Sequence, residues 1–201
     1  TLKTDYLDVF MLHQADEEIL SNDIIAATFQ RLKSDGLIRA TGASTYTTSE
    51  TELAIKSGMW DVIQLPFNLM VQSHGVFFEE AEANGVGVVI RSVLMKGLLS
   101  NRRGQLHPEL AKVSEHIQKL EALMDDQVAD MPRFSTKFAL SWPGVSSVLV
   151  GIDKMEYLQS AIQTVGGGEL GSELIEQAKQ MAYPDPAFLN LHHWSKMGWL
   201  K

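Results

Sequence analysis

The sequence predicts an α/β domain that is built on a parallel sheet, and two observations carry this prediction. Five short apolar runs, rich in β-branched residues, alternate with longer segments that keep helical spacing. Several of the short runs are apolar on both faces, which is typical of strands buried in a parallel sheet. Because strands and helices alternate along the chain, right-handed β-α-β crossovers are expected.

The expected strands are short and are bounded by turn residues or charged segments. They are residues 6–12, 37–43, 62–65, 86–90 and 145–150. The helices between them begin at capping residues or proline and stop at glycine, as around Asn22, Thr47 and Gly36. They are residues 21–33, 47–56, 73–83, 113–128, 132–141, 153–164 with Asp153 as the cap, and 173–181.

Composition excludes several classes of function. The net charge is −8, which argues against a surface that neutralises nucleic-acid phosphates. The chain has no cysteine, so disulfides and thiolate chemistry are excluded, and a reducing, cytoplasmic location is expected. No apolar run reaches the roughly 18 residues that a membrane span needs, so no membrane partner is expected.

The first and last strands carry little protection against pairing with another chain. Open sheets usually protect their edges with charge, proline or bulges, whereas residues 7–12 carry one charge and residues 147–150 carry none. If strand order follows sequence, as in a closed (β/α)8 TIM-type barrel, these strands are the edges of a five-stranded arc. A complete barrel needs about 250 residues, so we expect a partial barrel, with about three strands preceding Thr1. A doubly wound sheet with these strands in the middle is the alternative.

Five stretches resemble the aldo/keto reductase family and occur in the family's order. They are TDYLDVFMLH (4–13), LKSDGLIRATGAS (32–44), VIQLPFN (62–68), GVVIRSVLMKGLL (87–99) and ALSWPGVSSVLVG (139–151). The resemblance matches the family's barrel strands 4–8 with their adjoining turns, and it extends through residue 165. It implies that residues 1–201 are the C-terminal part of a single barrel domain.

The resemblance also implies an oxidoreductase that interconverts carbonyls and alcohols by hydride transfer, with NAD(P)H and a small carbonyl substrate. Reduction leaves negative charge on the carbonyl oxygen, so an acid must donate a proton and nearby donors must stabilise that charge. The family uses a tyrosine acid, a lysine, an aspartate and a histidine that orients the carbonyl. Only the histidine is matched here, as His13, so we expect the isolated chain to be inactive.

Residues at the strand ends match the family's cofactor site, at the end where barrels carry their active sites. Gln64 resembles the amide that holds the nicotinamide carboxamide, Ser44 resembles a hydroxyl that assists it, and Thr45 stands where many members have asparagine. Arg91 stands where members have an aromatic or an arginine, and its planar guanidinium can stack on a ring or meet phosphate. The loop beside the pyrophosphate is matched by Ser92, Leu94 and Gly97.

Each of these residues also has a purely structural interpretation. Strand-end Ser44 and Gln64 could cap the next helix or turn, Arg91 could pair with a carboxylate, and His13 could be a hydrogen-bonded strand end. The acidic run at residues 16–18 is typical of a solvated loop.

The adenosine end matches the family less well. Members that prefer the 2′-phosphorylated cofactor usually place Arg or Lys after the last strand. Here Gly151 and Asp153 are the expected contacts, and Lys154 is the only basic residue in the turn. A phosphate beside Asp153 would meet like-charge repulsion, so we expect no preference for NADPH over NADH.

Other functions remain open at this stage. A partial barrel could be a non-catalytic interaction module whose strand edges bind a second copy or another chain. A doubly wound binding domain would predict a glycine-rich first turn, which residues 14–16 do not supply. Adjacent His192 and His193 rarely converge on one ion, and no carboxylate is spaced to help them, so no metal site is expected.

Overall fold

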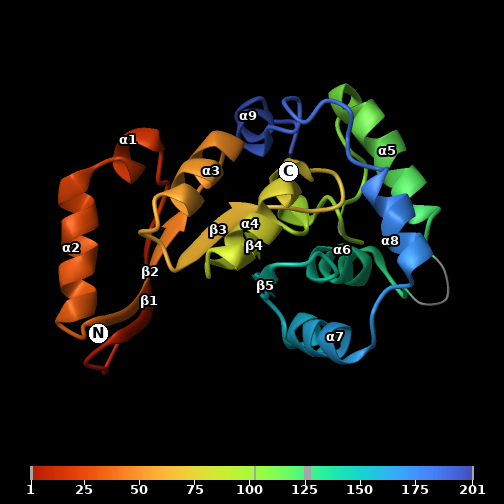
Figure 1. The fold of residues 1–201 in the computed structure, drawn as a ribbon. Helices are drawn as coiled ribbons and strands as arrows, with labels where there is room; N and C mark the ends of the chain where they lie inside the picture. The colour runs from red at the N-terminus through yellow and green to blue at the C-terminus, as the bar shows by residue number, and fades with distance from the viewer. Residues whose placement is uncertain (1, 102, 125–127, 201) are drawn as a thin grey trace. The chain divides into compact units, whose positions relative to one another are not determined.

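The computed structural model describes residues 2–101, 103–124 and 128–200 (Figure 1). Its sheet has five strands in sequence order: β1 (Leu7–Leu12), β2 (Ile38–Ser44), β3 (Val62–Pro66), β4 (Gly87–Arg91) and β5 (Val145–Val148). The pairs β1–β2, β2–β3 and β3–β4 are parallel. The predicted α/β fold with a parallel sheet is therefore confirmed. The doubly wound alternative is wrong, because β1 and β5 lie at the two ends of the strand order.

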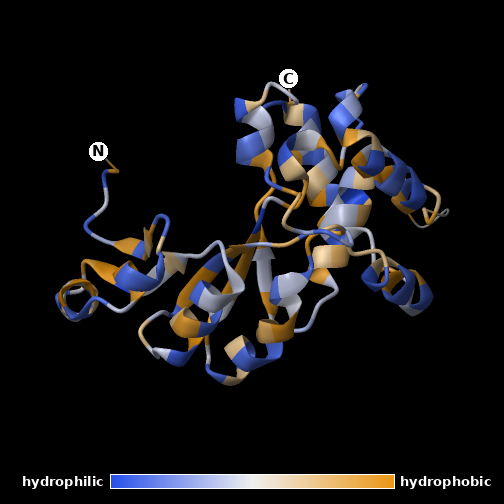
Figure 2. Ribbon diagram, turned by 90° about the horizontal axis from the view of Figure 1, so that it is seen from above, coloured by the Kyte–Doolittle hydropathy of each residue, from blue (hydrophilic) through white to orange (hydrophobic). Residues whose placement is uncertain are grey.

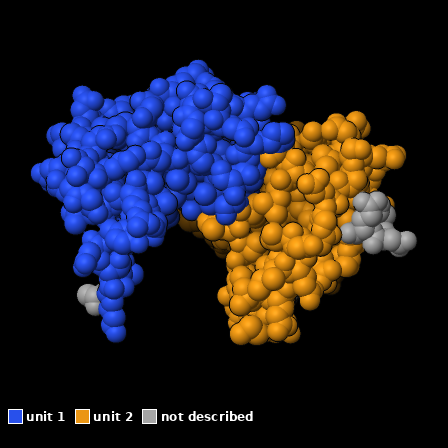
Figure 3. Space-filling view, turned by 60° about the horizontal axis from the view of Figure 1, so that its bottom comes forward, with its two compact units in different colours: residues 1–66, 73–91, 143–147 blue, residues 67–72, 92–142, 148–201 orange. Residues whose placement is uncertain are grey.

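The chain divides into two compact units, which are described separately (Figure 3). Unit 1 comprises residues 1–66, 73–91 and 143–147, and it holds the sheet as far as Ser147. Its helical elements are α1 (Glu17–Leu20), α2 (Asp23–Ser34), α3 (Thr48–Lys56), the 3-10 turn η1 (Ser73–Phe77) and α4 (Phe78–Ala83).

Unit 2 comprises residues 67–72, 92–142 and 148–201, and in its described part it is helical apart from the end of β5. Its elements are the 3-10 turns η2 (Met95–Gly97) and η3 (Pro108–Leu110), then α5 (Ala111–Glu121), α6 (Met131–Leu140), α7 (Met155–Gly166), α8 (Ser172–Lys179) and α9 (Leu191–Lys196). Phe67 and Phe138, both fully buried, stack with their ring centroids 6.0 Å apart in the core of this unit.

Buried and half-buried side chains alternate along the central strands β3 and β4, so one face of the sheet is buried there. Ile63, Leu65, Val88 and Ile90 are at most 1% exposed, and they point to one face because side chains alternate along a strand. The helices α2, α3 and α4 pack on β2, β3 and β4 in turn. Apolar residues are concentrated in these strands (Figure 2). The intervening residues of β3 and β4 are only half-buried.

The outer strand β1 differs from the central strands. Val9 and Phe10 are each 41% exposed, although they point to opposite faces, because adjacent residues alternate. Phe10 stacks on Phe29 of α2 at 5.3 Å between ring centroids. β1 is therefore apolar on both faces, as the sequence predicts, but it is not buried.

Several helix boundaries differ from the sequence prediction by one or two residues. The expected helix 73–83 is instead the 3-10 turn η1 followed by α4, and the largest difference is at α5. The expected helix 113–128 ends at Glu121, and Leu123 and Met124 make bonds of 3-10 type to Leu120 and Glu121. Asp125 and Asp126 follow in the sequence, and negative charge is unfavourable at a helix C-terminus. Residues 125–127 of this prediction lie outside the described part of the chain.

The cap of α7 is Lys154, so the prediction that Asp153 is the cap is wrong by one residue. The expected loop at residues 16–18 is instead the start of α1, because the side chain of Asp16 accepts from the backbone N–H of Ile19 and caps that helix.

Candidate functional site

Three predicted cofactor residues share one face of the sheet at its carboxyl end. In the strand register Ser44 lies opposite Gln64, and Arg91 lies opposite Pro66, two residues beyond Gln64 on β3. Because side chains two residues apart point to the same face, Ser44, Gln64 and Arg91 share one face. Gln64 and Arg91 are half-buried there, and Ser44 is buried at 2% exposed.

The predicted catalytic histidine directly follows β1. The register with β2 ends where Leu12 pairs with Ala43, and His13 is the next residue at this carboxyl end of the sheet. His13 is exposed, and the chain turns sharply after it, with Gln14 at φ 59° and the Ala15 N–H donating to the Ser44 carbonyl at 2.9 Å. An open hollow of about 200 Å³ lies next to this turn, lined by Gln14, Asp16, Tyr46 and Glu50.

The loop after β2, residues 45–47, is held by hydrogen bonds along its length. The Thr45 hydroxyl lies 2.8 Å from the Thr51 hydroxyl, and the Thr45 carbonyl accepts from Nη2 of Arg91 at 2.9 Å. The Glu50 carboxylate accepts from the N–H groups of Tyr46 and Thr47, which completes a capping box with Thr47 at the start of α3. Thr45 is fully buried, so its side chain serves the protein interior.

A buried histidine completes this network. Nδ1 of His74 lies 3.1 Å from the Thr51 hydroxyl, and the ring also hydrogen-bonds to the backbone of Tyr46. Burial lowers the pKa of His74 to about 4, and the positive charge of Arg91 acts in the same direction, while the Tyr46 bond and Glu50 oppose it. The imidazole is therefore neutral at pH 7.

Arg91 joins the end of β4 to the same loop. Its guanidinium carbon lies 4.1 Å above the centroid of the Tyr46 ring, a stacked cation–π contact. Burial lowers the pKa of Arg91, and Tyr46 and Glu50 oppose that effect, yet an arginine stays protonated at any ordinary pH. The guanidinium of Arg91 is thus a permanent positive charge on the side chain that shares a face with Gln64.

In unit 2, the segment after β4 has an unusual backbone. Ser92, Met95 and Lys96 have φ values of 59°, 46° and 54°, and Gly97 has 93°. Left-handed conformations are uncommon for residues other than glycine, and they gather at functional sites. The side chain of Asn68 donates to the Ser92 carbonyl at 3.2 Å, and the buried Ser135 hydroxyl donates to the Val93 carbonyl at 2.6 Å. Leu94 caps η2 and is half-buried.

The two residues expected at the adenosine end, Gly151 and Asp153, are exposed in unit 2. Space is open around Gly151, since a Cβ there would meet no atom within 4 Å. The neighbouring cation already has partners: Lys154 forms an ion pair with Glu156 at 3.6 Å and lies 5.8 Å from the centroid of the Tyr157 ring.

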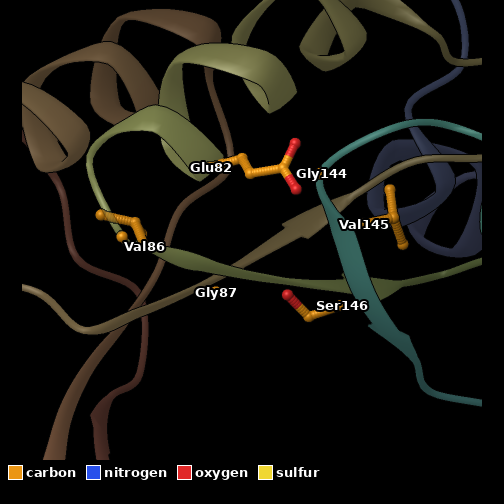
Figure 4. A pocket seen from close by; sticks show the side chains of 7 residues that line it. Glu82, Val86, Gly87, Gly144, Val145 and Ser146 are labelled. Carbon is orange, nitrogen blue, oxygen red and sulfur yellow. The ribbon is translucent and has the colours of Figure 1, made fainter.

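A second hollow, of about 290 Å³, lies at the amino ends of β4 and β5 in unit 1 (Figure 4). Glu82, Val86, Gly144 and Ser146 are among the residues that line it. Gly144 has φ 81°, and a Cβ there would lie 2.4 Å from the Phe78 carbonyl oxygen, so the packing requires glycine. Barrel enzymes keep their active sites at the opposite, carboxyl end, so this hollow is a structural feature.

Among the described residues, no three His, Asp or Glu side chains gather as a metal site would require. None of the helices in the described part of the chain combines the length and the apolar character of a membrane span.

Comparison with known proteins decides the family. The model of the aldo/keto reductase family matches residues 1–182. The chain belongs to the aldo/keto reductase family. An uncharacterized oxidoreductase of Bacillus subtilis, YqkF, is 28% identical over 184 residues, which are 87% of this chain and 60% of that protein. The L-glyceraldehyde 3-phosphate reductase of Escherichia coli O157:H7 is 26% identical over 203 residues, with 88% and 58% covered.

Solved structures of aldo-keto reductases share the fold. One from Bacillus halodurans matches with a TM-score of 0.78 at 22% identity, over 90% of this chain and 60% of that one. The glycerol dehydrogenase of Gluconobacter oxydans matches with a TM-score of 0.72 at 22% identity, over 90% and 59%. The chain therefore spans about 60% of the length of the relatives that it matches.

Sequence reasoning missed the residues that hold the loop after β2. Thr51 and Glu50 were expected only as part of a helix, and His74 had no role. A histidine between Ser73 and Gly75, at the entrance to the expected helix 73–83, was the available signal. Its partner Thr51 is 23 residues away in the sequence, so spacing along one helix could not reveal the pair.

Proposed function

We propose that this chain is the C-terminal part, about strands 4–8, of an aldo/keto reductase barrel domain and supplies the nicotinamide site of an NAD(P)-dependent carbonyl reductase. The observation that carries the proposal is the shared face of Ser44, Gln64 and Arg91 at the carboxyl end of a parallel sheet. An amide, a hydroxyl and a fixed cation fit a nicotinamide ring with its carboxamide, which needs both donors and acceptors.

Different residues of the chain would bind the cofactor and orient the substrate. Gln64 and Ser44 bind the carboxamide, and Arg91 lies against the ring or a phosphate. His13 orients the substrate carbonyl as a hydrogen-bond donor. The bound nicotinamide supplies the hydride. We assign the left-handed segment at Ser92, Leu94 and Gly97 to the pyrophosphate, and Gly151 and Asp153 to the adenosine.

The residues near the adenosine favour NADH at least as much as NADPH. Lys154 is paired with Glu156, and Asp153 beside it would repel a 2′-phosphate. The partners proposed are thus a nicotinamide cofactor and a small carbonyl compound. The lack of cysteine in the sequence favours a cytoplasmic location.

The partial-barrel part of the proposal is supported by the outer strand. Val9 and Phe10 of β1 are each 41% exposed, whereas a strand inside a closed barrel is covered on both faces. The tyrosine acid and the lysine of the family have no counterpart in the matched motifs. We therefore expect residues 1–201 alone to be inactive, and the complete gene product to be active.

The test is an assay of carbonyl reduction with NADH and NADPH, using the protein expressed from its complete gene, its His13→Ala variant and residues 1–201 alone. We expect turnover by the complete protein, a fall of about tenfold or more in His13→Ala, and none by residues 1–201. Full activity of His13→Ala would contradict the role of His13. Turnover by residues 1–201 would contradict their incompleteness.

A second candidate is a non-catalytic interaction module, and one observation favours it. Helix α7 exposes four apolar side chains at helical spacing, each more than a third exposed: Met155, Leu158, Ile162 and Val165. Such stripes usually pack against a partner. Light scattering distinguishes the candidates: a complete gene product that is an active monomer favours the enzyme, whereas an inactive, stable assembly favours the module.

A further inference from the structure

The loop at residues 45–47 is held more thoroughly than its length requires. The loop directly follows Ser44, which is a proposed nicotinamide ligand. Arg91 and Glu50 bind its backbone from β4 and α3, and Thr51 binds its buried hydroxyl. A single capping box would suffice to start α3, so the additional contacts serve the loop itself.

The side chains of Thr45, Thr51 and His74 form a buried series of hydrogen bonds next to the loop. All three side chains are at most 2% exposed, and each hydroxyl or ring nitrogen between them has a partner at 2.8 or 3.1 Å. Buried polar groups that are fully paired make an arrangement specific, since a displaced member leaves an unpaired group behind. The ring of His74 also hydrogen-bonds to the backbone of Tyr46. His74 therefore connects these buried side chains to the middle of the loop.

We propose that His74 and Thr51 are positioning residues, which fix the loop at residues 45–47 so that Ser44, in register with Gln64, meets the nicotinamide carboxamide. This inference rests on the proposed function. His74 acts through Thr51 and the Tyr46 backbone, and it touches neither cofactor nor substrate.

Ligand affinity distinguishes a positioning role of His74 and Thr51 from a merely structural one. Ser44 and Gln64 are assigned to the nicotinamide alone. Loosening the loop therefore weakens a ligand that contains nicotinamide and spares ADP-ribose, which lacks it. A merely structural role would lower the affinity for both ligands together or change neither.

The matched variants are Thr51→Val, which keeps the shape but removes the hydroxyl, and Thr51→Ser, which restores it. Thr164→Val is the control, because Thr164 is another buried threonine, whose hydroxyl donates to the Ser160 carbonyl inside α7. Affinities for NADH and ADP-ribose are measured by calorimetry on the protein expressed from its complete gene, with thermal unfolding followed by circular dichroism. Should Thr51→Val not fold, Thr51→Ala, which leaves room for a bridging water, takes its place.

We expect Thr51→Val to bind NADH about fivefold more weakly, the size of effect that one lost hydrogen bond gives, and to bind ADP-ribose within twofold of wild type. Thr51→Ser and Thr164→Val should match the wild type for both ligands. Unchanged NADH affinity in Thr51→Val, or an equal loss for both ligands, overturns the positioning role and leaves the proposed function intact. A wild-type protein that binds neither ligand overturns the proposed function, and this inference with it.

Discussion

The segments that follow β1 and β2 leave the same end of the sheet on neighbouring strands, yet they differ in how they are held. After β2, Thr45 is fully buried, and the loop is bound by Arg91, Glu50 and Thr51. After β1, His13 is exposed and is followed by the left-handed turn at Gln14. The nicotinamide side of the proposed site is thus built by contacts within unit 1, whereas the proposed substrate side is open in this chain.

The largest expected effect concerns His74, whose protonation would disrupt the buried hydrogen bonds beside the loop after β2. Its folded pKa of about 4 lies below its ordinary value of 6.5. Between these two pH values the unfolded chain binds more protons than the folded chain. The contribution of neutral His74 to the free energy of unfolding is therefore complete above about pH 6.5 and is lost as the pH falls towards 4. The shift corresponds to roughly 3 kcal/mol.

Urea unfolding of wild type and His74→Gln at pH 7.5 and 4.5 measures this contribution, since Gln cannot titrate. Arg91 and Glu50, the charged groups that act on the His74 ring, are common to both proteins. We expect the wild type to lose about 2–3 kcal/mol more than His74→Gln over this interval. Equal losses would show that His74 does not titrate with a lowered pKa.

The Glu50 capping box is expected to have a smaller effect on the same loop. Glu50→Ala removes the acceptor of the Tyr46 and Thr47 N–H groups and should cost about 1 kcal/mol of unfolding free energy. Glu52→Ala is a matched control in α3, because Glu52 forms an exposed ion pair with Lys56. This variant should cost less than about 0.5 kcal/mol. Equal costs for the two variants would mean that the loop is not held through Glu50.

The smallest effect is expected at the open segment. His13→Ala should change the unfolding free energy of residues 1–201 by no more than about 0.5 kcal/mol, because an exposed side chain loses little when it is shortened. Urea denaturation measures it. A cost above 1 kcal/mol would show that His13 is bound within the chain, and would remove the contrast with the loop after β2.

The sequence predicted the strands and placed Ser44 and Gln64 at strand ends, because apolar runs are local signals. The parallel sheet followed from the order of the elements. It did not predict the Thr45–Thr51–His74 chain, because that chain depends on which helix packs against which loop. The cap of α7 differs from the prediction by one residue, which is the usual spread of a helix end. The larger difference is at α5, which ends at Glu121 rather than at residue 128 and is followed by two adjacent aspartates, Asp125 and Asp126, in the sequence.

The central claim is that Gln64 holds a nicotinamide, and it is tested most directly by NADH affinity. Gln64→Met keeps the length of the side chain and removes its amide, so the fold should persist. In the protein expressed from its complete gene, we predict at least about tenfold weaker NADH binding in Gln64→Met, with ADP-ribose binding unchanged, since an unpaired carboxamide is costly to bury. Equal NADH affinity in the two proteins would contradict the account.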